Sequence, residues 1–303
     1  FLEDGLLTCD KITTMNIPIK ILSTGFSMPV FGMGTWPMGG KREHDLSNDD
    51  ARDIAAIQKG IEMGVTHIDT AERYAAGYTE TLVGKAIKDA DRKKLFITSK
   101  VSPEHLLYAD VMESLQASLK RLGTTYLDLY LVHEPNPDIP IADTMHAMDD
   151  LVAEGFIKNI GVSNFTKERF EEAQFYAKNK IVANQVHYNL IYREPERKEL
   201  VEYCQNNDVM LIAWRPVQRG SLTEKGITIL DEMCEKYHKT PSQIAINWLT
   251  SQPNVVTLSK MTDEKHLTEN LAALDFTMTP EDIEKLRKEF PDQKDVSDVV
   301  PLV

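Results

Sequence analysis

The chain has 303 residues and is 42% hydrophobic, which is enough for one α/β barrel or two ordinary domains. Its formal net charge of −13 argues against a nucleic-acid partner, which requires a basic face. No apolar run reaches the ~18 residues of a membrane-spanning helix, and no signal-peptide pattern opens the chain. We therefore expect a cytoplasmic protein with neither a membrane nor a nucleic-acid partner.

The cysteines support the same compartment. They are odd in number and lack metal-ligand spacing, so they indicate reduced thiols and no metal site. They are Cys9, Cys204 and Cys234. Because the chain begins at Phe1 and Met15 is a candidate native start, we expect residues 1–14 to be an unordered leader or added segment. Residues 15–303 are expected to form one domain.

In chain order, the first predicted element is a hairpin. Residues 17–22 and 28–30 flank a Ser23-Thr24-Gly25 turn, and such a hairpin could plug one end of a barrel. The Gly32-Met33-Gly34 sequence that follows lacks the third glycine and the helix of a Rossmann site, so that site is rejected.

Strands and helices then alternate along the rest of the chain. Apolar runs predict eight strands, at 30–35, 66–71, 95–101, 127–133, 157–164, 182–188, 209–215 and 255–260. Helices are predicted at 48–63, 79–90, 108–122, 141–154, 167–179, 195–207, 229–237 and 241–250, with an extra C-terminal helix at 280–290. Alternation implies a parallel sheet, and eight repeats favour a (β/α)8 TIM barrel.

Three successive predicted strands end in ionisable residues. Asp69 ends one strand, with Tyr74 in the following turn, and Lys100 and His133 end the next two. Barrels of parallel strands carry their chemistry at this edge. An ammonium lowers the pKa of a neighbouring phenol, and an aspartate would keep that lysine charged. The set suits protonation of an alkoxide during carbonyl reduction, with the hydride supplied by a cofactor. Singly, each residue has a structural alternative as an ion pair, a packing ring or a strand cap.

The sequence closely resembles the aldo-keto reductase family from about residue 17 to 290. The motifs that carry the resemblance are Gly32-Met33-Gly34-Thr35-Trp36, His67-Ile68-Asp69-Thr70-Ala71, Leu127-Asp128-Leu129-Tyr130-Leu131-Val132-His133 and Gly161-Val162-Ser163-Asn164-Phe165. The resemblance implies a catalytic tetrad in which Tyr74 is the general acid, Lys100 and Asp69 tune it, and His133 orients the carbonyl. It also implies NADPH bound in an extended form.

The resemblance assigns cofactor contacts residue by residue. Ser163, Asn164 and Gln185 would hold the nicotinamide carboxamide, and Trp214 would stack on the ring unless it is only core packing. The loop at 215–222 would cross the pyrophosphate. The other residues assigned to the cofactor are Thr35, Trp36, Arg215, Val217, Arg219, Lys260, Met261, His266, Glu269 and Asn270. Trp36 is also a candidate wall of the substrate pocket, with plain core as an equal alternative.

Three residues depart from the family pattern. Met261 stands where many members have a serine and His266 where they have an arginine, both near the 2′-phosphate of NADPH. We therefore expect a weak preference for NADPH over NADH. Glu134 stands where an aromatic residue is common, so the pocket is expected to be polar and to disfavour carboxylates. Short loops after the fourth and seventh strands predict an open pocket for small or polar aldehydes and ketones.

Two other functions remain open from the residues alone. A cofactor-binding redox sensor, similar to potassium-channel β subunits, would carry the same tetrad. A barrel aldolase could use Lys100 as a Schiff base, but Gln185, Trp214 and Lys260 would then be unexplained. The family resemblance implies a monomer or weak homo-oligomer.

Overall fold

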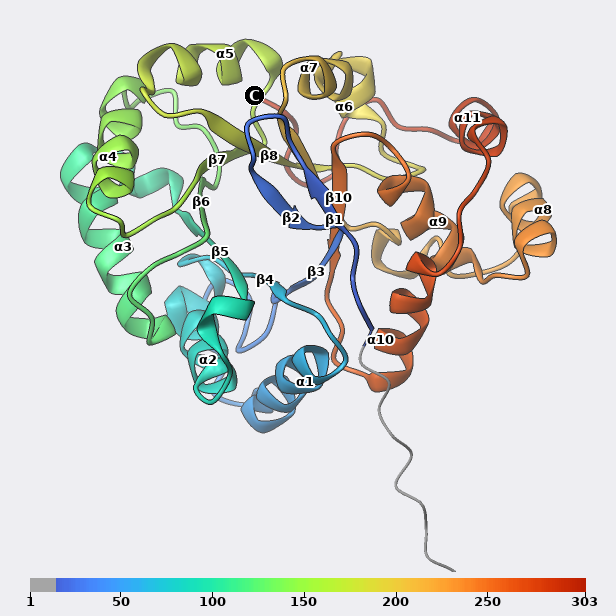
Figure 1. Cartoon of the computed structure of the whole chain (residues 1–303), viewed down its shortest axis with the longest axis horizontal. Helices are drawn as coiled ribbons and strands as arrows, with labels where there is room; N and C mark the ends of the chain where they lie inside the picture. The colour runs from blue at the N-terminus through green and yellow to red at the C-terminus, as the bar shows by residue number, and fades with distance from the viewer. Residues whose placement is uncertain (1–14) are drawn as a thin grey trace, which may run out of the picture.

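Eight parallel strands close into a barrel with helices in a ring around it (Figure 1). The computed structural model describes residues 15–303, so the predicted leader at 1–14 lies outside the described residues. Around the barrel the strand order is β10-β3-β4-β5-β6-β7-β8-β9. The bounds are β3 Phe31–Gly34, β4 His67–Asp69, β5 Phe96–Val101, β6 Leu129–Val132, β7 Ile160–Ser163, β8 Ile181–His187, β9 Met210–Trp214 and β10 Val255–Ser259. The predicted (β/α)8 architecture is confirmed.

The helices differ from prediction in two places. They are α1 Asp50–Glu62, α2 Tyr78–Ile87, α3 Tyr108–Leu122, α4 Ile141–Ala153, α5 Lys167–Tyr176, α6 Glu194–Arg197, α7 Leu200–Asn206, α8 Thr228–Tyr237, α9 Pro241–Thr250, α10 Glu264–Leu271 and α11 Pro280–Glu289. The helix predicted at 195–207 is broken, because Glu199 adopts a left-handed backbone with φ +56°. The sequence analysis missed α10, whose start is capped by the Asp263 carboxylate.

Side chains of each strand alternate between the barrel interior and the helices. On β6, Leu129 and Leu131 join an interior apolar cluster, whereas Tyr130 and Val132 pack outward. The interior cluster also contains Met210, Ile212, Val256 and Leu258 of β9 and β10. The barrel interior is therefore a packed core. Every second residue of a strand points inward, and the last inward residue of each strand lies at the C-terminal edge.

The N-terminal hairpin plugs one end of the barrel, as predicted, at the N-terminal edge of the strands. Strands β1 (Ile19–Ile21) and β2 (Ser27–Pro29) pair antiparallel and lie across the barrel in Figure 1. Met28 is fully buried in the interior cluster. Lys20 of β1 donates to three backbone carbonyls between the end of α9 and the start of β10, those of Thr250, Gln252 and Val255, at 2.7, 2.5 and 2.5 Å. The hairpin thus combines an apolar plug with a polar anchor.

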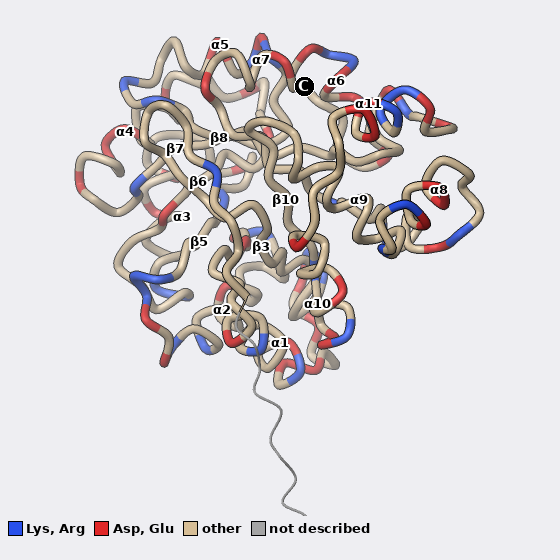
Figure 2. The backbone as a smooth tube through the Cα atoms, turned by 45° about the vertical axis from the view of Figure 1, so that its right-hand side comes forward, with Lys and Arg blue, Asp and Glu red and all other residues tan. Residues whose placement is uncertain are grey.

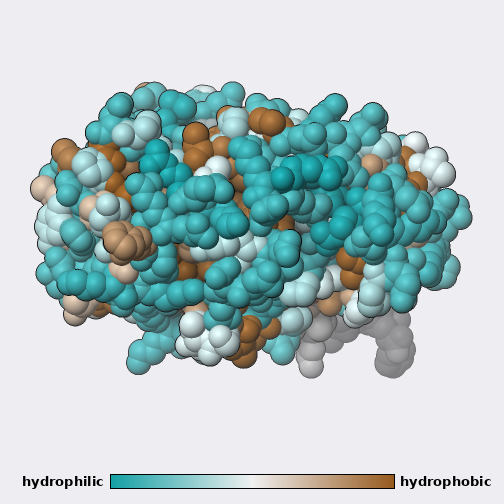
Figure 3. Space-filling model, turned by 90° about the horizontal axis from the view of Figure 1, so that it is seen from above, coloured by the Kyte–Doolittle hydropathy of each residue, from teal (hydrophilic) through white to brown (hydrophobic). Residues whose placement is uncertain are grey.

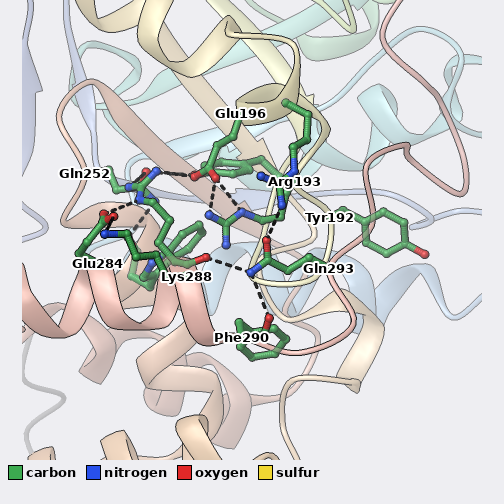
Figure 4. A network of polar contacts seen from close by, with 12 residues as sticks. Tyr192, Arg193, Glu196, Gln252, Glu284, Lys288, Phe290 and Gln293 are labelled. Atoms are coloured by element: carbon green, nitrogen blue, oxygen red, sulfur yellow. Dashed lines mark hydrogen bonds and ion pairs between the residues drawn. The ribbon is translucent and has the colours of Figure 1, made fainter.

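A buried polar network fixes the extra C-terminal helix, α11, to the barrel (Figure 4). Arg193, which is fully buried, pairs with Glu196 and lies 4.6 Å over the ring of Trp248 in α9. Arg287 of α11 pairs with the same carboxylate at 2.5 Å and donates to Gln252 at 2.9 Å. Both arginines share one acid, so α6, α9 and α11 are held together at one point.

Charged residues lie mainly on the outer helices and loops, while the strands are largely uncharged (Figure 2). The face seen in Figure 3 is mostly hydrophilic, with small apolar patches scattered over it. None of the helices in residues 15–303 combines the length and the apolar character that crossing a membrane requires.

Candidate active site

Strand register brings the predicted catalytic residues together at the C-terminal edge of the barrel. Thr98 on β5 pairs with Asp69 on β4, and Lys100, two residues further, points the same way. His133 follows β6, where it continues the inward series of Leu129 and Leu131. Tyr74 comes from the loop after β4. We refer to Asp69, Tyr74, Lys100 and His133 as the tetrad.

Lys100 is the centre of the tetrad. It is fully buried, and its Nζ lies 2.6 Å from Asp69 Oδ1, 2.8 Å from the Thr70 carbonyl oxygen and 3.2 Å from the Tyr74 hydroxyl. Burial opposes the charge, but Asp69 and Tyr74 outweigh it and raise the pKa of Lys100 above its ordinary value. Lys100 is therefore a permanent ammonium at neutral pH.

The expected lowering of the Tyr74 pKa is wrong. Burial raises the pKa of Tyr74 above its ordinary value, and Lys100 offsets this only in part. The negative charge of Asp69 acts in the same direction as burial. The sequence analysis considered the ammonium alone, and it could not weigh desolvation. Tyr74 is consequently protonated at neutral pH, the form that a proton donor requires.

His133 lies against Tyr74, with ring centroids 5.6 Å apart and an edge-on geometry. Burial, followed by the positive charges of Lys100 and Arg73, lowers the pKa of His133 well below its ordinary value. The imidazole is neutral at pH 7, with one N–H donor. Its Nδ1 is buried and makes no hydrogen bond to any of residues 15–303.

The two predicted substrate-wall residues flank the tetrad. Trp36 is 37% exposed and its ring lies 5.0 Å from that of Tyr74, so it is not a core residue. Glu134 pairs with Arg73 at 3.2 Å, a contact that the sequence analysis missed. Arg73 also pairs with Glu104 at 3.2 Å. The charge of Glu134 is thus balanced by an arginine, and a polar substrate wall stays a prediction.

The three residues assigned to the carboxamide form one hydrogen-bonded group. Ser163 Oγ donates to the Gln185 carbonyl at 2.8 Å, and Asn164 Nδ2 donates to Ser163 Oγ at 3.0 Å. Gln185 Nε2 crosses the barrel to Asp69 Oδ2 at 2.7 Å. Asn164 Oδ1 is buried and makes no hydrogen bond to any of residues 15–303. An acceptor in this state fits the NH₂ group of a primary amide.

Trp214 ends β9 facing inward and is partly exposed. The loop that follows, 215–222, contains Arg215, Val217 and Arg219, of which Arg219 is exposed. Arg215 Nη1 lies 3.5 Å from Asp298 Oδ1 of the C-terminal tail. At the end of β3, which pairs with β4, Thr35 is buried and donates to the Asp69 carbonyl at 2.9 Å.

The residues assigned to the adenosine end lie on and before α10. Lys260 and His266 are exposed, whereas Met261 is 2% exposed and offers no donor. Glu269 and Asn270 lie near the end of α10, where the Glu269 carboxylate accepts from the Thr240 hydroxyl at 2.7 Å. The phosphate contacts of Lys260 and His266 stay a prediction.

The sequence of nearly the whole barrel matches a known family. The model of the aldo/keto reductase family matches residues 30–289. The glyoxal reductase of Bacillus subtilis (strain 168) is 35% identical over 276 residues, which are 90% of this chain and 93% of that protein.

Solved structures give the same result at the level of the fold. The thermostable aldo-keto reductase Tm1743, in complex with the inhibitor epalrestat, is 45% identical with a TM-score of 0.86, over 89% of this chain and 99% of that one. An aldo-keto reductase from Klebsiella pneumoniae in complex with NADPH is 34% identical with a TM-score of 0.81, over 93% and 98% of the two chains. The chain belongs to the aldo/keto reductase family.

Proposed function

We propose that the protein reduces small or polar aldehydes and ketones to alcohols with NADPH, and that Tyr74 donates the proton. The observation that carries this proposal is the contact of the buried Lys100 ammonium with both the Asp69 carboxylate and the Tyr74 hydroxyl. A phenol held by an ammonium in a water-poor site is suited to protonating an alkoxide.

The proposed proton transfer uses the tetrad in a fixed order. The neutral His133 imidazole donates a hydrogen bond to the substrate carbonyl oxygen and orients it beside Tyr74. As that oxygen gains charge, the O–H bond of Tyr74 breaks and the proton moves to it. The phenolate that remains lies 3.2 Å from Lys100 Nζ, which stabilises it until a proton from solvent restores the phenol.

The reduced nicotinamide, when bound, supplies the hydride that no side chain can provide. Ser163, Asn164 and Gln185 would hold its carboxamide, and the unpaired Asn164 Oδ1 supports that fit. The relative from Klebsiella pneumoniae, solved with NADPH, supports the same cofactor. Because Met261 and His266 offer the 2′-phosphate little, we propose that NADH is also accepted.

Residues beside the tetrad and one relative support the proposed substrate class. The Arg73–Glu134 pair gives a polar wall, and only residues 133–140 separate β6 from α4. The relative from Bacillus subtilis is a glyoxal reductase. We propose small carbonyls of this kind, including methylglyoxal and glyceraldehyde. A cytoplasmic monomer or weak homo-oligomer remains a prediction.

A titration with NADPH and with NADH, followed by tryptophan fluorescence, tests the cofactor first. The same protein is then assayed with methylglyoxal, glyceraldehyde and a nitrobenzaldehyde by the loss of NADPH absorbance. Tyr74→Phe is expected to lower turnover by about a thousandfold while NADPH affinity stays within about threefold. Binding without turnover in the wild type would favour the redox sensor instead, and turnover by Tyr74→Phe near the wild-type rate would remove Tyr74 as the acid.

A further inference from the structure

A buried histidine stands directly behind the ring proposed to face the nicotinamide. His187 ends β8 and is the register partner of Trp214 on β9. The two rings stack with centroids 4.1 Å apart and planes 8° apart, and Tyr192 stacks on the same imidazole at 4.3 Å. His187 is 2% exposed. The plane of Trp214 is therefore set by a side chain that lies two positions after Gln185 on the same strand.

Both nitrogens of His187 are satisfied by groups from other segments. Nε2 lies 2.9 Å from Gln218 Oε1, an amide oxygen that can only accept, so Nε2 carries the proton. Nδ1 lies 2.8 Å from Ser297 Oγ and accepts the hydroxyl proton. The Ser297 oxygen accepts in turn from the backbone N–H groups of Val299 and Val300 at 3.2 Å. The neutral imidazole thus joins the 215–222 loop to the C-terminal tail.

The loop that His187 holds has an unusual backbone. Arg215, Gln218 and Arg219 have φ values of +59°, +42° and +53°, in the left-handed region that residues other than glycine seldom adopt. Asn189 Nδ2 donates to the Arg215 carbonyl at 2.9 Å and to Gln218 Oε1 at 3.0 Å. A strained loop keeps such a shape only where its surroundings impose it, and here His187 and Asn189 do so.

The C-terminal tail, which His187 contacts through Ser297, also reaches Asn164, one of the residues assigned to the nicotinamide carboxamide. The Val303 N–H donates to the Asn164 carbonyl at 3.2 Å, and the Thr166 N–H donates to the Val303 carbonyl at 3.0 Å. One end of the tail is therefore fixed at His187 through Ser297, and the other at the end of β7. A change at His187 would act on Trp214, on the loop and on the tail together.

We propose that His187 is a positioning residue of the cofactor site, which fixes the ring plane of Trp214 and ties the 215–222 loop to the C-terminal tail. The proposal rests on the proposed function, because Trp214 and the loop matter to binding only if a nicotinamide cofactor occupies this edge. The charged or titratable groups that face His187 are Arg215, Asp298, Glu194 and Tyr192. Burial lowers the pKa of His187 to about 4, so it stays neutral at pH 7.

Two substitutions separate the stacking from the hydrogen bonds. His187→Phe keeps a ring behind Trp214 and removes both hydrogen bonds, whereas His187→Gln keeps a donor toward Gln218 and removes the ring. Ser297→Ala removes the contact between His187 and the tail, together with the acceptor of the Val299 and Val300 N–H groups, and leaves the His187 ring in place. It still tests the proposal if a His187 variant does not fold. His146→Gln, at an exposed site on α4, is the matched control.

The readouts are the dissociation constant of NADPH, the KM of the carbonyl at saturating NADPH, and the tryptophan emission of the cofactor-free protein. Loss of both hydrogen bonds in His187→Phe is expected to raise the dissociation constant about tenfold, and Ser297→Ala about threefold. Carbonyl KM should stay within about twofold, because the tetrad is untouched. His187→Gln should shift the emission of Trp214. Repeating the substitution in a Trp214→Phe background shows which part of the emission comes from Trp214.

Unchanged NADPH affinity in both His187→Phe and Ser297→Ala would overturn the proposal. So would equal losses in NADPH affinity and in carbonyl KM, which indicate general damage to the site. If the wild type neither binds NADPH nor reduces a carbonyl, the proposed function fails and the cofactor role of His187 fails with it. An unchanged emission in His187→Gln would separately show that the imidazole does not fix Trp214.

Discussion

Two lysines at opposite ends of the barrel show how surroundings decide what a buried ammonium does. Lys100, at the C-terminal edge, contacts a carboxylate, and its pKa is raised. Lys20, at the plugged end, donates to three neutral carbonyls, and burial lowers its pKa to about 8. A full opposing charge outweighs desolvation, whereas carbonyl dipoles do not. The first lysine is suited to holding a charge during a reaction, and the second to closing the barrel.

Replacing Lys100 is expected to give the largest effect. Lys100→Met removes the ammonium beside Tyr74, so the phenolate formed in the reaction loses its stabilising charge. Turnover should fall by about a thousandfold. The variant also leaves Asp69 buried without its cation, so cooperative unfolding must be checked before the rate is measured. Turnover near the wild-type rate in the folded variant would mean that both lysines are structural.

Replacing Lys20 should change stability and leave the reaction intact. Lys20→Met leaves the carbonyls of Thr250, Gln252 and Val255 without their donor, and the free energy of unfolding should fall by about 2 kcal/mol. Denaturant unfolding measures this difference. Turnover of the folded variant should stay within about twofold of the wild type. A large loss of turnover would contradict the assignment of a structural role to Lys20 and of a chemical role to Lys100.

The pH dependence of stability should show a second, separate effect of the same lysine. The folded-state pKa of Lys20 is about 8, below the 10.5 of an ordinary lysine, so between these pH values the unfolded chain binds more protons. The stability that Lys20 contributes should therefore rise as pH rises from about 8 to 10.5. Unfolding free energies of wild type and Lys20→Met, measured across this range, should diverge. A constant difference would mean that the carbonyls hold the pKa at its ordinary value.

Much of the barrel could be predicted because its signals are local. Apolar runs marked all eight barrel strands near their true positions, and the period of two placed Asp69, Lys100 and His133 on one edge. Short elements without strong periodicity were harder. Helix α10 has eight residues and Asp263 as its cap, and the break at Glu199 depends on one backbone angle.

The parts of the candidate site that the sequence did not predict depend on distant contacts. Arg73 and Glu134 are 61 positions apart, and His187 and Ser297 are 110 apart, so no local pattern joins them. The sign of the Tyr74 pKa shift depends on how tightly the folded chain excludes water. One signal was available: His187 continues the inward series of Ala183 and Gln185.

The alternation of side chains along the strands also limits how this chain can tolerate insertions and deletions. Removing one residue from β5 ahead of Lys100 would turn its side chain from the barrel interior to the helices, and the ion pair with Asp69 would be lost. The same change between Glu134 and α4 leaves the strand register intact and shortens a connecting loop. Loop lengths around the substrate pocket can therefore vary, whereas the number of residues in each strand is fixed by the alternation of inward and outward side chains.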